Sequence, residues 1–268
     1  MNSFVAGILG IVLPLMMVQR KIDIVLIGFV FACMPVIMQL GRMFFATFSD
    51  FWGRKPFFIL NGLLGIVSGL IYYFAHTALE FLFGKVAEGT KEGTLWAVNR
   101  AFLLERSPDQ LRILVYMRTV IYVAYAFGSL LAGFLISWLL FEGTMILCAL
   151  SGIFVLLLSL FLANERKEHF SVAKALQFLD IRKRGRVFKI FLFLFFCMGL
   201  AFGFIGGFVI PVFLSAANFN AENIGLIVCL QIVSAGLSSY IFSRTTKIRS
   251  LVLLSGMLFS TVLILLGF

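Results

Sequence analysis

Four charged side chains lie in the middle of the apolar stretch 78–103 and are the residues of this sequence most able to do chemistry. They are Lys85, Glu88, Lys91 and Glu92. A charge that faces lipid at the centre of a bilayer costs about 2.5–3.5 kcal/mol. Pairing at a spacing of three residues, as between Lys85 and Glu88 or between Glu88 and Lys91, offsets part of that cost. The stretch predicts a helix whose polar stripe faces protein or water.

This stripe has two interpretations. Helical periodicity puts five polar or aromatic residues on one face and leaves Lys91 beside it. In the structural interpretation, ion pairs lock the helix to its neighbours. In the functional interpretation, which is the default for ionisable residues within a membrane, the stripe lines a cavity for a polar substrate or for protons. The candidate cavity residues are Lys85, Glu88, Glu92, Trp96 and Asn99.

A second polar group follows the apolar stretch 23–47 and contains Asp50, Gly53, Arg54 and Lys55. Glycine tolerates the positive φ of a tight turn, and the two cations favour an anionic leaflet. Asp50 precedes Arg54 by four residues, so the two can pair on a helix. The ion pair is either a latch between two conformations or part of a loop that only determines topology.

Catalytic and metal-binding patterns are absent from the sequence. The four cysteines lie inside apolar runs, without a CxxC pair or a neighbouring histidine, and the two histidines are isolated. We therefore expect no metal, no cofactor and no catalytic residues. A membrane enzyme, a channel and a receptor-like module remain weaker alternatives. No nucleotide-binding motif is present to couple the protein directly to ATP.

The composition excludes a soluble domain. Of the 268 residues, 62% are apolar, 16% aromatic and only 13% charged, whereas soluble domains carry about 25% charged residues. A bilayer-crossing helix needs about 20 mostly apolar residues. The fold class is therefore an all-α polytopic membrane protein with nine predicted spans, at 3–19, 23–47, 57–75, 78–103, 113–140, 144–163, 188–215, 222–243 and 250–268.

The distribution of lysine and arginine predicts the orientation. The connections after the second, fourth, sixth and eighth stretches, with their flanks, hold 18 of the 22 basic residues, and the opposite connections hold only Arg20 and Lys21. Positive loops stay in the cytoplasm, so we expect a cytoplasmic N-terminus in the cell membrane. The net charge of +10 then indicates contact with an anionic inner leaflet rather than with nucleic acid.

The only long connection divides the chain into three parts. A six-helix bundle at 1–163 precedes a cytoplasmic basic linker at 164–186, and a partial bundle of three helices follows at 187–268. Pro14 and Pro211 lie in similar apolar sequences that are 197 residues apart.

The same offset relates Ile27-Gly28 to Ile224-Gly225. The offset spans an even number of helices, so the two copies run parallel. Two parallel halves with a substrate site between them are a common plan among transporters.

The connection around Asp50 resembles the signature of the major facilitator superfamily, G-x-x-x-D-x-x-G-R-[RK]. Asp50, Gly53, Arg54 and Lys55 match, and Ala46 replaces the first glycine. The resemblance implies the helical bundle of that family, in which this loop helps to close the cytoplasmic side and the aspartate meets the eleventh helix.

Two further segments are similar to the same family. Lys85-Val-Ala-Glu88-Gly89 is similar to the family's R-x-x-Q-G motif, although both polar residues differ. The segment from Glu105 to Arg112 is similar to the family's pattern of an acidic residue followed by P-x-x-x-R. The resemblance implies that Glu105 and Arg112 join the charge network of the loop. It also implies that the fourth helix lines the cavity.

The function implied by the resemblance is a permease. It would be a secondary active transporter that moves a small solute by alternating access, with proton coupling indicated by the buried acids. Family members carry sugars, drugs, peptides and anions. Two repeats of 197 residues would make about 394, so we expect the chain to hold the first nine of twelve helices. The alternative is a truncated, transport-inactive remnant.

Overall fold

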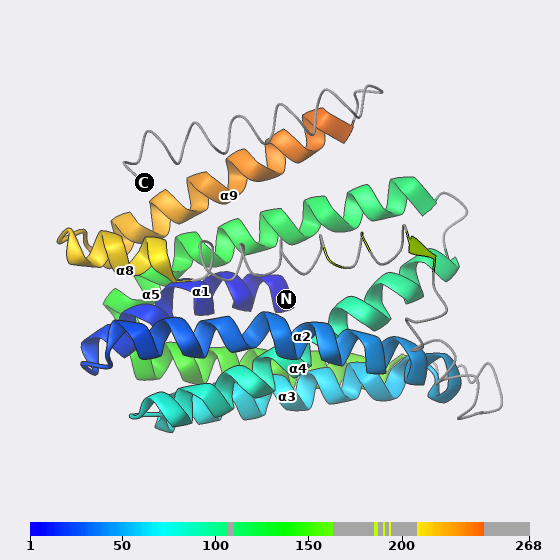
Figure 1. Cartoon of the computed structure of the whole chain (residues 1–268), viewed down its shortest axis with the longest axis horizontal. Coiled ribbons are helices and arrows are strands. Elements are labelled where there is room, and N and C mark those ends of the chain that lie inside the picture. The colour runs from blue at the N-terminus through cyan, green and yellow to red at the C-terminus, as the bar shows by residue number, and fades with distance from the viewer. Residues whose placement is uncertain (107–109, 163–184, 187–189, 191–192, 194–207, 244–268) are drawn as a thin grey trace.

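The described part of the protein is all α-helical. The computed structural model describes residues 1–106, 110–162, 185–186, 190, 193 and 208–243. Its long helices run alongside one another as a bundle (Figure 1). The helices are α1 (Asn2–Gln19), α2 (Ile24–Trp52), α3 (Lys55–Phe74), α4 (Ala78–Arg106), α5 (Gln110–Leu160), α8 (Val209–Ala216) and α9 (Ala221–Ser243).

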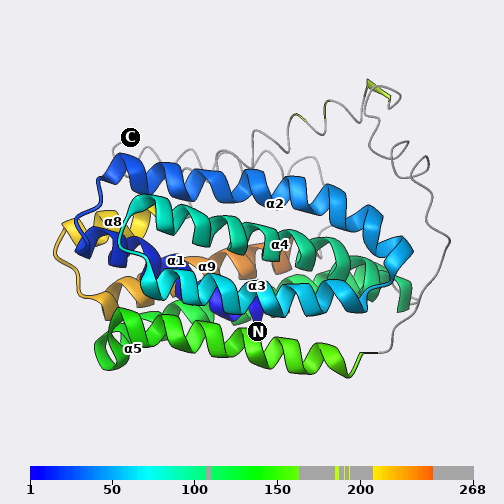
Figure 2. The same ribbon diagram turned by 90° about the horizontal axis from the view of Figure 1, so that it is seen from below.

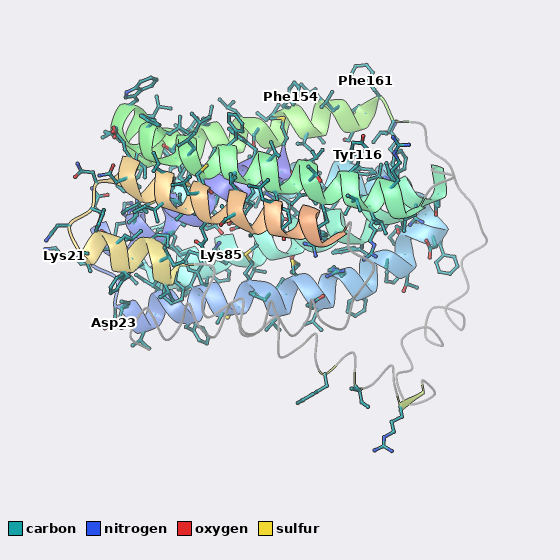
Figure 3. The ribbon with its side chains drawn as sticks, turned by 90° about the horizontal axis from the view of Figure 1, so that it is seen from above. Lys21, Asp23, Lys85, Tyr116, Phe154 and Phe161 are labelled. Carbon is teal, nitrogen blue, oxygen red and sulfur yellow. The ribbon has the colours of Figure 1, made fainter. Side chains whose placement is uncertain are left out.

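Helix α5 contains two of the predicted spans, 113–140 and 144–163. Leu140 has φ 60° and ψ −178°, which breaks the helix. The chain reverses there, so Tyr116 and Phe161 lie at the same end of the bundle, opposite Lys21 (Figure 3). The two legs of α5 are therefore antiparallel, and the predicted division into two separate helices at these positions is confirmed.

Within the part of the chain that the structure describes, four helices are long and apolar enough to cross a membrane: α1, α2, α3 and the stretch 112–160 of α5. Helix α2 continues five residues past the predicted end at 47, so Asp50 lies in its last turns. The predicted span 250–268, most of 188–215 and the linker up to residue 184 lie outside the described residues.

Helix α4 lies between α2 and α3, and the second leg of α5 lies on the other side of α3 (Figure 2). Helix α1 packs against α5 and is the most buried element, with Ile11, Val12 and Leu13 fully inaccessible to solvent. A charged helix is tolerated in this fold because its neighbours on both sides separate it from lipid.

Small residues allow α3 and the second leg of α5 to approach closely. Gly62, Gly65 and Gly69 of α3 face Leu156, Gly152 and Ala149. A Cβ atom added to Gly152 would lie 2.6 Å from the backbone nitrogen of Ile66. Close backbone approach at small residues is typical of membrane helix packing, where the hydrophobic effect does not drive helices together.

The 197-residue repeat extends to backbone conformation. Lys21 and Asn218 occupy equivalent positions and both have positive φ, 57° and 62°. Helices α1 and α8 end 197 residues apart, and α2 and α9 begin 197 residues apart. The backbone hydrogen bonds at the two turns are also equivalent. Arg20 N donates to Met16 O, as Ala217 N does to Phe213 O. Ile22 N donates to Met17 O, as Phe219 N does to Leu214 O.

Replacing Gly152 with leucine should destabilise the protein strongly. The new side chain meets the backbone of α3 rather than a flexible side chain, and overpacking of this kind costs about 3 kcal/mol or more. We expect a clear loss of folded protein in thermal unfolding measured in detergent. Gly185→Leu is the control because nothing lies within 4 Å of a Cβ at that position. Equal melting of the two variants would contradict the tight α3–α5 contact.

Candidate functional site

The four charged residues of α4 are buried inside the described bundle. Lys85, Glu88, Lys91 and Glu92 are between 2% and 7% exposed. We call these four residues the α4 charge cluster. Figure 3 labels Lys85, which lies among the helices rather than at the ends of the bundle. The polar stripe of the sequence therefore faces protein along this part of α4.

Lys85 and Glu88 form an ion pair, and each of them also contacts an aromatic side chain of a neighbouring helix. Lys85 Nζ lies 2.9 Å from Glu88 Oε2, and the Tyr72 hydroxyl of α3 donates to the same oxygen at 2.6 Å. Lys85 Nζ also lies 4.3 Å from the centre of the Phe31 ring of α2, in cation–π geometry. This pair joins α2, α3 and α4.

Glu92 is less satisfied than Glu88. Lys91 Nζ lies 3.8 Å from Glu92 Oε1, which is too long for a hydrogen bond. That oxygen is buried and has no hydrogen-bond partner among the described residues. A buried carboxylate oxygen that accepts no hydrogen bond destabilises the protein, because the group has lost its hydrogen bonds to water.

A small cavity lies further along the same stripe. Its volume is about 40 Å³, and it is bounded by α1, α4 and the first leg of α5. Two predicted cavity residues, Trp96 and Asn99, line it; the complete lining is Ser3, Leu95, Trp96, Asn99, Arg100, Met117 and Ile121. Sequence reasoning missed Arg100 at this site because it counted this residue only as an orientation signal.

A larger groove runs along α2 and is almost entirely apolar. It measures about 470 Å³, and none of the predicted cavity residues lines it. Its walls are mostly aromatic, including Phe44, Phe45, Phe48 and Trp52. This groove offers no polar chemistry to a solute.

The second candidate site gathers around Arg54, which is 8% exposed. Its guanidinium lies 2.8 Å from Asp50 Oδ1 and 2.6 Å from Glu105 Oε1, and it also donates to the Ser49 hydroxyl. Gly53 ends α2 with φ 81°, which turns the chain so that Arg54 points back to α2 and α4. The predicted Asp50–Arg54 pair is present, and Glu105 joins it.

The other two residues of the loop motif have different partners. Lys55 Nζ donates to the carbonyl of Leu160 at 2.7 Å, at the end of α5. The Arg112 guanidinium lies 5.9 Å from the centre of the Tyr116 ring. Lys55 thus ties the loop to the second leg of α5, and Arg112 stacks on its own helix.

Removing one member of the Lys85–Glu88 pair should destabilise the protein more than removing both. Lys85→Met leaves a buried carboxylate without its cation, which costs roughly 3–5 kcal/mol. Adding Glu88→Gln removes the charge and keeps an oxygen for the Tyr72 hydroxyl, so most of the stability should return. Thermal unfolding in detergent measures both variants.

The control is Glu142→Gln, which removes a carboxylate that is 51% exposed and lies 3.4 Å from Arg20. Exposed pairs contribute about 0–1 kcal/mol, so this variant should melt close to the parent protein. If Lys85→Met also melts there, the pair does not hold the helices together.

Comparison with known proteins places this geometry in a family. No curated protein sequence matches the chain at a significant level. The sequence profile of the Major Facilitator Superfamily, by contrast, matches residues 1–268. Its match agrees with the loop motif around Arg54 and with the repeat of α1 and α2 in α8 and α9. The chain is a multi-pass membrane protein that belongs to the Major Facilitator Superfamily of transporters.

Proposed function

We propose that this protein is a secondary active transporter that moves a small solute by alternating access. The parallel repeat and the family support a mechanism in which one half rocks against the other. The distribution of basic residues supports a cytoplasmic N-terminus and an anionic inner leaflet in the cell membrane.

We also propose that transport is coupled to protons, because one carboxylate oxygen of Glu92 is buried without a hydrogen-bond donor in the part of the chain that the structure describes. Its buried Oε1 lacks a hydrogen-bond partner among the described residues, and protonation would relieve the cost of burying a charge there. Glu88, by contrast, has Lys85 Nζ and the Tyr72 hydroxyl as partners of its Oε2. In this proposal Glu92 carries the proton and the Lys85–Glu88 pair positions α4.

The charge network at Arg54 is proposed as the cytoplasmic latch. Arg54 binds Asp50 and Glu105 at once, while the Asp50 side chain remains 60% exposed. Asp50 can therefore accept a further bond from the other half when the inner side closes. Gly53, Lys55 and Arg112 shape and anchor this end of the bundle.

Substituting Glu92 with glutamine should uncouple transport from the proton gradient. The amide resembles the protonated acid and cannot release a proton. In proteoliposomes screened with a solute panel, we expect gradient-driven accumulation to fall more than about tenfold, which corresponds to roughly 1.4 kcal/mol of free energy in the solute gradient. Exchange of solute across the membrane without a gradient should persist.

The matched control is Glu80→Gln, an exposed acid on the same helix. Glu80 accepts from the backbone nitrogens of His76 and Thr77, a capping position that also suits glutamine. Gradient-driven accumulation that survives Glu92→Gln would refute proton carriage by Glu92. A parent protein that moves no solute of a broad panel would refute the transporter proposal itself.

The stable double variant Lys85→Met/Glu88→Gln separates the two interpretations of the pair. If Lys85 and Glu88 contribute to transport, the double variant should fold like the parent protein but transport at a reduced rate. Normal transport by the folded double variant would leave the pair a structural role only. Size-exclusion profiles of both proteins check that folding is equal.

A further inference from the structure

Asn61 of α3 connects three helices through its side-chain amide. The residue is buried and only 1% exposed. Its Oδ1 accepts a hydrogen bond from Asn2 Nδ2 of α1 at 2.6 Å. Its Nδ2 donates to the backbone oxygen of Lys91 at 2.8 Å and lies 3.3 Å from Thr94 Oγ1. One buried amide therefore joins α1 and α3 to the part of α4 that carries Glu92.

The hydrogen bonds determine how the amide is oriented. The backbone oxygen of Lys91 can only accept, so the NH2 group of Asn61 has to face α4 and its oxygen has to face α1. Thr94 Oγ1 donates to the same Lys91 oxygen at 2.6 Å, which leaves it able to accept from Asn61. All three residues are buried, so water does not readily replace a bond that is lost.

Contacts on two sides fix the rotation of α4 about its own axis. Towards α3, a Cβ atom added to Gly65 would lie 3.7 Å from Lys91 Cδ. Towards α2, a Cβ atom added to Gly93 would lie 3.0 Å from the backbone oxygen of Met38. Successive residues of an α-helix point about 100° apart. Glu92, between Lys91 and Gly93, therefore faces neither α3 nor α2, the two helices on either side of α4 (Figure 2).

The direction left to Glu92 is the side of the small cavity. Trp96 and Asn99 follow Glu92 by four and seven residues, so the three residues share one face of α4. Trp96 and Asn99 line the cavity together with residues of α1 and α5. A rotation of α4 by the spacing of one residue would turn Glu92 away from the cavity and towards α2 or α3.

We propose that Asn61 is a positioning residue for transport, which holds α4 through the backbone of Lys91 in the rotation that directs Glu92 to the cavity. Asn61 itself contacts neither the proton nor the solute. The importance of this rotation for proton coupling rests on the function proposed above. The rotation itself is measured without any transport.

Disulfide cross-linking across the cavity reports the rotation of α4. In the full chain with its four cysteines replaced by alanine, Asn99→Cys on α4 is combined with Met117→Cys on α5, because both residues line the cavity. Asn61→Leu keeps a side chain of similar size and removes its hydrogen bonds. We expect the rate of cross-linking by copper phenanthroline to fall at least about fivefold, which corresponds to roughly 1 kcal/mol.

A second cysteine pair checks that the fold is intact. It consists of Ser137→Cys on α5 and Glu222→Cys on α9, at side chains whose oxygens lie 3.0 Å apart. This pair includes α5 but not α4, so Asn61→Leu should leave its cross-linking unchanged. Equal losses at both pairs would show a general loss of structure and overturn the positioning role. Unchanged cross-linking across the cavity would overturn it as well.

Three further variants separate the bonds of Asn61. Asn2→Ala removes only the bond to α1 and should retain most of the cross-linking across the cavity. Asn61→Asp keeps an acceptor for Asn2 and, when protonated, a donor for the Lys91 oxygen, so its rate should lie between those of Asn61→Leu and the parent protein.

Ser68→Ala is the matched control on α3. The Ser68 hydroxyl is buried like Asn61 but donates within its own helix, to the Gly65 oxygen at 3.1 Å. Cross-linking should therefore match that of the parent protein. A loss as large as that of Asn61→Leu would contradict a specific role of Asn61.

Transport assays distinguish this proposal from proton carriage by Glu92. Asn61→Leu should lower gradient-driven accumulation while exchange without a gradient persists. If Glu92→Gln leaves accumulation intact but Asn61→Leu still slows cross-linking, proton carriage by Glu92 is wrong and Asn61 nevertheless sets the rotation of α4. If Glu92→Gln uncouples transport but Asn61→Leu slows cross-linking without changing accumulation, the positioning role in transport is wrong.

Discussion

The burial of charge in α4 is the constraint on which the rest of the described structure depends. Four charged residues on one helix cannot face lipid at an acceptable free energy, so α4 has to be enclosed. Helices α2 and α3 cover it on two sides, and each supplies a side chain that engages the cluster. Phe31 of α2 faces Lys85, and Tyr72 of α3 donates to Glu88.

Enclosing α4 requires the surrounding helices to pack closely, and glycine makes this possible. The glycines of α3 meet Gly152 and its neighbours on α5 at backbone distance, and Gly93 of α4 lies against the backbone of α2 near Gly41. At the inner end Arg54 ties α2 to α4 through Asp50 and Glu105. The helices thus form a unit that can move as one body, as rocking of the two halves requires.

The chemistry of the proposed transport cycle is ordered along α4. The Lys85–Glu88 ion pair comes first. It is followed by Glu92, whose Oε1 has no hydrogen-bond partner among the described residues. The cavity-lining residues Trp96, Asn99 and Arg100 come last. Glu92 and Trp96 are about one helical turn apart, so the proposed proton carrier lies next to the small cavity that Trp96 and Asn99 line.

The sequence by itself determined the class of protein, most of the helix positions, the polar stripe, the loop motif and the parallel repeat. These follow from local properties, namely hydropathy over about 20 residues, spacing along a helix and similarity at a constant offset. The structure then added a match that the sequence comparison had not included, the equivalent turns at Lys21 and Asn218.

Only the tertiary structure decided which charges are satisfied. Tyr72 and Phe31 lie on α3 and α2, so the spacing of residues along α4 could not show that Glu88 has hydrogen-bond partners while Glu92 Oε1 has none among the described residues. The bonds of Arg54 to Asp50 and Glu105 likewise depend on the contact between α2 and α4. Side chains acquire their electrostatic partners through packing between distant segments, and that packing is not encoded in the spacing of residues along one helix.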